Sequence, residues 1–136
     1  MATNEGRVYF ALDGDDFNPD DVTHLLDIEP TFIVRKWSKI PNRIPVKSSW
    51  ELSTDNVVNN FIDVFSMADS IIEILKPKKQ KIIQAIEKFS LRPRLEVVLW
   101  FSINEEHSTP AIGFEANTIK FLGDINAFID IDTYKH

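Results

Sequence analysis

The most strongly patterned segment of the chain, residues 94–103, reads RLEVVLWFSI. Apolar side chains occupy every second position from Leu95 to Ile103, which is the two-residue period of a β-strand. The positions between them, which include Glu96, are only half apolar. We therefore expect a central strand of a sheet, with one face packed on helices and the other less completely buried.

Strand and helix patterns alternate on both sides of this segment. Period-two or β-branched stretches predict strands over 7–13, 31–37, 49–53, 110–114 and 128–134. Helices are predicted from an Asn18-Pro19 start to Pro30, from Thr54 or Asp55 to Leu75, from Pro77 onward, and over 117–122 before Gly123. This order predicts a single α+β domain over residues 1–136. We expect a two-layer sandwich with a mostly antiparallel sheet of about five to six strands, helices on one face, ferredoxin-like in spirit.

Composition excludes several classes of protein. The 136 residues are 43% hydrophobic and include no cysteine. That apolar fraction is too high for a disordered chain, and the length is sufficient for a self-supporting core. The lack of cysteine excludes a disulfide framework, thiolate metal sites and a cysteine nucleophile.

Charge and hydropathy bear on location and partners. The longest apolar run, residues 97–101, is far shorter than the ~20 residues that span a membrane, and residues 1–6 carry no basic and apolar leader pattern. We therefore expect a cytoplasmic protein without membrane association. The net charge of −6 opposes nucleic-acid binding, which depends on surplus lysine and arginine. The oligomeric state is left open.

Acidic residues concentrate in the segment 13–29. A calcium-binding EF-hand loop that starts at Asp13 is excluded. Its sixth position would be Asn18 instead of glycine, and its twelfth His24 instead of glutamate. A turn followed by a helix N-terminus explains these acids without a ligand. The alternative is an acidic patch that binds a basic partner. Its candidate residues are Asp15, Asp16, Asp20 and Asp21.

Two carboxylates share one face of the last predicted strand. Asp130 and Asp132 are two residues apart, so they could raise one pKa or bind a metal together. The simpler interpretation is a solvent-facing strand side, because the sequence indicates no third ligand or base. The histidines are isolated from one another and form no zinc-binding pair. We therefore assign no catalytic residue, no metal ligand and no cofactor.

Tryptophans are the remaining candidates. Trp100 is expected in the core or against a helix, whereas Trp37 and Trp50 flank a proline-containing basic loop over 38–48. A basic loop between aromatic residues can bind single-stranded nucleic acid, but the net charge disfavours this here. Tryptophan is enriched at protein-binding hot spots, so Trp50 joins the candidate partner-binding residues.

Several motifs together resemble a known family. They are Val8-x-Phe10, Asp15-Asp16, Pro19-Asp20-x-Val22, Leu25-Leu26-x-Ile28-x-Pro30, Trp50-Glu51-Leu52-Ser53, Thr109-Pro110-x-Ile112-x-Phe114 and Ile129-Asp130-Ile131-Asp132-x-Tyr134. With these motifs the chain resembles, over essentially its full length, the bacterial proteins grouped as domain of unknown function 4279. The resemblance implies a small single-domain bacterial protein and carries over no catalytic residue.

These observations favour a non-enzymatic protein-binding module. A small acidic domain without a catalytic set suits an immunity-type protein that occludes a basic toxin, because opposite charge speeds capture. The alternatives are a metal-assisted hydrolase that uses Asp130 and Asp132 with acids from 13–16, and a small-ligand-binding domain.

Overall fold

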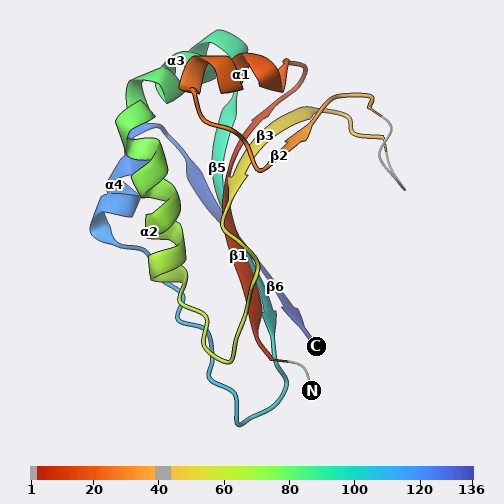
Figure 1. The fold of residues 1–136 in the computed structure, drawn as a ribbon, viewed down its shortest axis with the longest axis vertical. Helices are drawn as coiled ribbons and strands as arrows, with labels where there is room; N and C mark the ends of the chain where they lie inside the picture. Colours follow the sequence, from red (N-terminus) through yellow and green to blue (C-terminus); the bar gives the residue numbers. More distant parts are fainter. Residues whose placement is uncertain (1–2, 39–43) are drawn as a thin grey trace.

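The computed structural model describes residues 3–38 and 44–136 (Figure 1). The elements follow one another along the chain in the order β-α-β-β-β-α-α-β-α-β, with a 3₁₀ turn between the two consecutive α-helices. In sequence they are β1 (Glu5–Gly14), α1 (Pro19–Leu26), β2 (Phe32–Val34), β3 (Ser48–Ser53), β4 (Val57–Val58), α2 (Val64–Leu75), the 3₁₀ turn η1 (Lys76–Lys78), α3 (Lys79–Phe89), β5 (Arg92–Phe101), α4 (Ala116–Asp124) and β6 (Phe128–Lys135).

The strands form one mixed sheet in the order β2-β3-β1-β5-β6, with β4 paired to the start of β1. The pairs β2–β3, β3–β1 and β1–β5 are antiparallel. Together with α1 and the α2–α3 segment, these four strands form the β-α-β-β-α-β arrangement of ferredoxin-like folds. After β5, α4 leads to β6, which pairs with β5 in parallel. The predicted α+β fold class, with a mostly antiparallel sheet, is confirmed.

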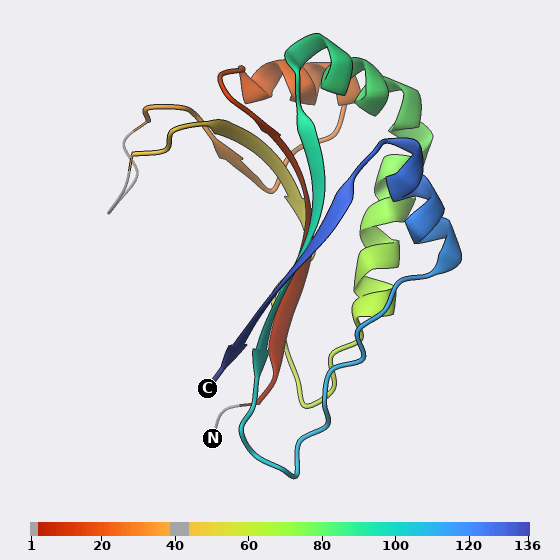
Figure 2. The same ribbon diagram turned by 180° about the vertical axis from the view of Figure 1, so that it is seen from behind.

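All the helices lie on the same side of the sheet, as the two opposite views show (Figure 1 and Figure 2). The core lies between these layers and includes Phe10 and Leu12 of β1, Trp50 of β3, and Leu95 and Leu99 of β5, each fully buried. Alternation along β1 and β5 therefore sends one set of side chains into the core and the other to the opposite face. No helix of the described residues covers that second face.

The start of α1 follows the sequence prediction. The Asn18 side chain accepts a hydrogen bond from the Asp20 backbone N–H at 3.0 Å, and Pro19 begins the helix. The helix ends at Leu26, before the predicted stop at Pro30, because Asp27 adopts a left-handed conformation with φ of 54°. Its backbone N–H bonds to the Thr23 carbonyl at 2.8 Å and closes the last turn.

Two predicted elements are wrong. The helix expected from Thr54 begins only at Val64, where the Asp63 side chain caps α2 by accepting from the Phe65 N–H at 3.1 Å. Thr54 instead donates its N–H to the Val8 carbonyl, and β4 pairs with β1, so strand pairing overrides the helical pattern. The strand expected over 110–114 is reduced to a single bridge between Asp63 and Ala111.

Smaller differences concern element ends. The strand predicted over 31–37 is limited to β2, and α4 continues through Gly123 instead of ending there. Residues 39–43 of the predicted basic loop lie outside the described residues. Among the helices that the structure describes, none is both long and apolar enough to cross a bilayer.

Gly14 is closely packed and Gly123 is not, so alanine substitutions at the two positions can be compared. A Cβ at Gly14 would lie 2.6 Å from Phe17 Cδ1 and 2.8 Å from Leu91 Cδ2, whereas a Cβ at Gly123 would meet no atom of the described residues within 4 Å. We expect Gly14→Ala to lower the free energy of unfolding by about 1–3 kcal/mol through overpacking. Gly123→Ala, in helix α4, is expected to raise it by roughly 0.5–1 kcal/mol. Urea unfolding measures both, and equal stability of the two variants would contradict this packing.

Candidate functional site

The face of the sheet turned away from the helices carries most of the candidate chemistry. We call it the open face. Strand register fixes its membership, because paired residues share a face: Tyr9 pairs with Glu96, and Glu96 with Asp130. Its charged and aromatic side chains are Glu5, Arg7, Tyr9 and Asp13 of β1, Phe32 of β2, Glu51 of β3, Arg92, Arg94, Glu96 and Trp100 of β5, and Phe128, Asp130, Asp132 and Tyr134 of β6.

Arg94 is the centre of a hydrogen-bonded network on this face. Its Nε donates to Asp13 Oδ2 at 3.0 Å and its Nη2 to Asp13 Oδ1 at 3.3 Å, while Nη1 reaches the Tyr9 hydroxyl at 3.2 Å. Nη1 also donates to Glu96 Oε1. Burial alone would lower the pKa of Arg94, but the bonds to Asp13, Tyr9 and Glu96 outweigh it and raise that pKa. The guanidinium is therefore permanently charged and fixed in place.

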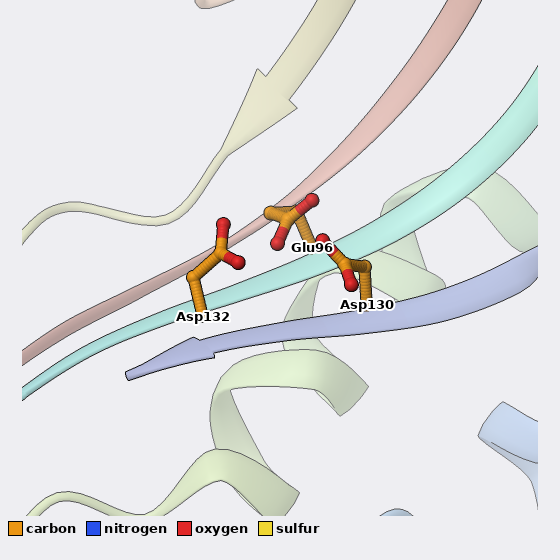
Figure 3. A group of neighbouring side chains, drawn as sticks. All are labelled: Glu96, Asp130 and Asp132. Carbon is orange, nitrogen blue, oxygen red and sulfur yellow. The ribbon is translucent and has the colours of Figure 1, made fainter. Parts of the chain in front are cut away.

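Glu96 is the most buried carboxylate of the open face. Its side chain is only 2% exposed, although β5 is paired with β6, an edge strand whose side chains are mostly exposed to solvent. One oxygen, Oε1, accepts a hydrogen bond from Arg94, whereas the buried Oε2 receives none from residues 3–38 or 44–136. Carboxylate oxygens of Asp130 and Asp132 lie within 4.8 Å of one another and of Glu96 (Figure 3). The three form what we call the carboxylate cluster.

The environment of Glu96 changes its protonation. Burial raises the pKa of Glu96 to about 7, with hydrogen bonding of the protonated form to Asp130 and Asp132 adding to the rise and the Arg94 bond opposing it. An ionised Oε2 can only accept hydrogen bonds, and it faces two further acceptors. Glu96 therefore changes its charge near neutral pH.

Aromatic side chains lie beside the carboxylate cluster. Trp100 and Tyr134 stack with ring centroids 5.4 Å apart. They form the next pair on the open face after Val98 and Asp132. Trp100 is half-buried on the open face, so its predicted place in the core or against a helix is wrong. Tyr134 is 49% exposed. The cluster is thus bordered by an arginine network on one side and an accessible aromatic pair on the other.

Comparison with protein families identifies the chain. A family model described as a domain of unknown function, DUF4279, matches residues 4–136. The chain belongs to the DUF4279 family. A search of curated proteins and a search of solved structures found no match. The family membership confirms the resemblance seen in the sequence and adds no activity.

Basic side chains of the same chain partly neutralise the predicted acidic patch. All four candidate aspartates are exposed, at the β1–α1 turn and the start of α1. However, Arg35 pairs with Asp20 at 2.9 Å and Lys36 with Asp15 at 3.5 Å. Surface ion pairs of this kind contribute little to stability but cancel local charge. Asp16 and Asp21 are the remaining exposed carboxylates of that set.

Trp50 does not lie on the surface. It is fully buried between the sheet and α1, and its Nε1 donates to Thr23 Oγ1 at 3.0 Å. In this position the ring packs in the core and presents no surface to a partner. The aromatic residue that offers an accessible ring beside charged groups is instead Tyr134.

Hollows occur away from the carboxylate cluster. A pocket of about 350 Å³ lies beyond the ends of β5 and β6, where His107 Nδ1 is 2.6 Å from Ser102 Oγ. A second, of about 390 Å³, lies between α1 and α3 and is lined by His24 and Phe89. These two hollows do not include Glu96, Asp130 or Asp132.

Sequence reasoning missed Glu96 as the third carboxylate of the cluster. The signal was present, since a glutamate in the middle of the most apolar strand is unusual unless it is paired. What the sequence lacked was the knowledge that the last strand runs parallel to β5 and pairs Asp130 with Glu96. The acids at 15 and 16, which the hydrolase hypothesis combined with Asp130 and Asp132, lie instead at the β1–α1 turn.

Glu96 gives a pH-dependent stability that can be measured. Between its ordinary pKa of 4.5 and about 7, the folded chain binds more protons than the unfolded chain. The free energy of unfolding therefore falls as pH rises through this window, by up to about 1 kcal/mol per pH unit. Glu96→Gln imitates the protonated acid and does not titrate. We therefore expect the stability of the variant minus that of wild type to increase as the pH rises from 4.5 to 8. Denaturant unfolding in a chelator measures this gain.

The matched control is Glu87→Gln at an exposed site on α3. That substitution is expected to leave the difference from wild type constant across the same pH range. A Glu96→Gln difference that is equally constant would contradict the assigned environment of Glu96.

Proposed function

We propose that this DUF4279 chain is a non-enzymatic binding module whose open face contacts a basic protein partner. The observation that carries the proposal is that one whole face of the sheet, rich in charged and aromatic side chains, is covered by no helix of the described residues (Figure 2). A sheet face that no helix covers is the natural place for another macromolecule to bind as a further layer.

Charge supports a basic partner. The carboxylates of the open face outnumber its arginines, and the whole chain carries −6. Arg94 is bonded to Asp13 and Glu96, so the charge left over at the β6 side of the face is negative. A negative face accelerates encounter with a positive protein and disfavours acidic ones.

The finer proposal is an immunity role. A basic toxin that processes nucleic acid needs a positive surface for its substrate, and a negative sheet face would occlude that surface. Asp16 and Asp21, exposed beside the paired Asp15 and Asp20, would add to the rate of capture. Tyr134 supplies the kind of accessible ring that anchors protein interfaces.

Metal-assisted hydrolysis is the second candidate, and the carboxylate cluster favours it. A cation held by three carboxylates can lower the pKa of a bound water and orient it for attack. Against it, Asp130 and Asp132 belong to an edge strand with exposed side chains, whereas catalytic sites usually exclude water from a concave pocket. Hydrolysis of phosphodiester or ester substrates by purified protein with Mn²⁺ would support this candidate over binding.

Capture from a lysate of the source cells tests the open-face proposal. We expect immobilised wild-type chain to retain a basic protein at low salt and to release it as salt rises. Tyr134→Lys adds positive charge to the open face beside the carboxylate cluster and keeps its three carboxylates. It is expected to lower the retained amount at least about tenfold, the equivalent of ~1.4 kcal/mol.

The control is Ile119→Lys on the helix side, where Ile119 is 54% exposed on α4. It makes the same change of charge at a similarly exposed apolar site and is expected to retain the partner as wild type does. Equal loss in both variants, or retention that neither variant changes, would contradict binding through the open face. Both experiments are run in a chelator, so that bound cations play no part.

A further inference from the structure

We propose that Glu96, Asp130 and Asp132 form a binding site for a divalent cation that prefers oxygen ligands, with Ca²⁺ the best fit. The inference goes beyond the proposed partner binding, because it concerns an ion and three particular side chains instead of a surface. It rests on the geometry of the carboxylate cluster, on one buried oxygen atom and on the balance of charge around it.

Strand register brings the three ligands together. Glu96 of β5 lies directly beside Asp130 of β6, and Asp132 is the next residue of β6 on the same face (Figure 3). One oxygen from each side chain lies within 4.8 Å of the other two. Calcium–oxygen distances of about 2.3–2.6 Å allow ligand atoms on one ion to be up to ~5 Å apart. Mg²⁺ binds at roughly 2.1 Å, demands near-ideal octahedral geometry and gives up its water reluctantly, so an open cluster of three carboxylates suits it less well.

The buried oxygen of Glu96 is the independent observation that points to a ligand. Its Oε2 is inaccessible to solvent and receives no hydrogen bond from a donor of the described residues, while the side chain as a whole is 2% exposed. Figure 3 shows the Glu96 carboxylate directed between the two aspartates. A buried ionised oxygen without a partner is costly. A cation at this point supplies the missing partner and offsets the repulsion among the carboxylates.

Arg94 positions the glutamate without occupying the site. It donates to Oε1 of Glu96 and is itself held by Asp13 and Tyr9, so the carboxylate cannot rotate freely. This is the role that hydrogen-bonded outer groups have around metal ligands. The other partners of Arg94 belong to β1, which lies on the opposite side of β5 from β6, and Oε2 remains available to an ion.

Local charge leaves room for a divalent ion. Asp13, Glu96, Asp130 and Asp132 together carry −4 when ionised, and Arg94 carries +1, so the net charge of these five groups is −3. A divalent cation reduces it to −1. Because Asp130 and Asp132 reach solvent, an ion can enter from the open face and keep water molecules in its remaining coordination positions.

Calorimetric titration of chelator-treated protein with Ca²⁺, Mg²⁺ and Zn²⁺, each alone, tests the site. We expect one saturable Ca²⁺ site per chain, weaker binding of Mg²⁺, and a melting temperature that rises with Ca²⁺ concentration. Asp130→Asn with Asp132→Asn is expected to weaken Ca²⁺ binding at least about tenfold, and Glu96→Gln to do the same. Tb³⁺ is a second probe, because Trp100 and Tyr134 stack next to the cluster and can sensitise its emission.

The control variant is Asp15→Asn with Asp16→Asn, which removes the same charge from the exposed β1–α1 turn. It is expected to bind Ca²⁺ as wild type does. Three results overturn the proposal: no saturable Ca²⁺ binding by wild type at millimolar concentration, binding that the cluster variants leave unchanged, or an equal loss in the control. Since partner capture is measured in a chelator, failure of the cation site leaves the open-face proposal standing, and the reverse also holds.

Discussion

The bidentate contact between Arg94 and Asp13 joins the two central strands on the face that no helix covers. A guanidinium with 19% of its side chain exposed needs such partners, because a buried charge without one is strongly destabilising. The same contact turns Nη1 of Arg94 toward Glu96 and thereby fixes the orientation of that carboxylate. The availability of Oε2 depends on this arrangement, because Arg94 engages Oε1. The raised pKa of Glu96 comes instead from burial and from Asp130 and Asp132, against the effect of Arg94.

The parallel pairing of β5 and β6 is the second requirement. In the first part of the fold, neighbouring strands are antiparallel, as the ferredoxin-like order demands. The α4 crossover returns the chain in the direction of β5 and so sets Asp130 and Asp132 beside Glu96 and Val98. A hairpin in place of α4 would have reversed β6 and placed its aspartates elsewhere along β5. The carboxylate cluster is therefore a product of topology as much as of residue type.

The sequence was informative where local patterns and tertiary packing agree. Alternation along 94–103 predicted β5 and its two faces, and Asn18-Pro19 predicted the start of α1. It failed where a distant strand competed: the apolar positions before Asp63 suit a helix, yet Val57 and Val58 pair with the first residues of β1. The prediction for Trp100 was wrong because it relied on the size of the side chain, which suggests burial. Trp100 is four residues from Glu96 on the same strand, so both side chains lie on the open face. Glu96 became recognisable as a third carboxylate only with the strand register.

Cation binding and partner binding would not be independent if both involve the β6 side of the open face. A cation held by Glu96, Asp130 and Asp132 would remove most of the negative charge that we propose attracts a basic protein there. Thermodynamic linkage then requires that the partner weaken cation binding by the same factor as the cation weakens partner binding. Conversely, a lysine or arginine of the partner could take the place of the ion at Oε2. Because burial raises the pKa of Glu96, a proton would be the third competitor for the same oxygen, and the charge of this face would depend on which of the three occupies it.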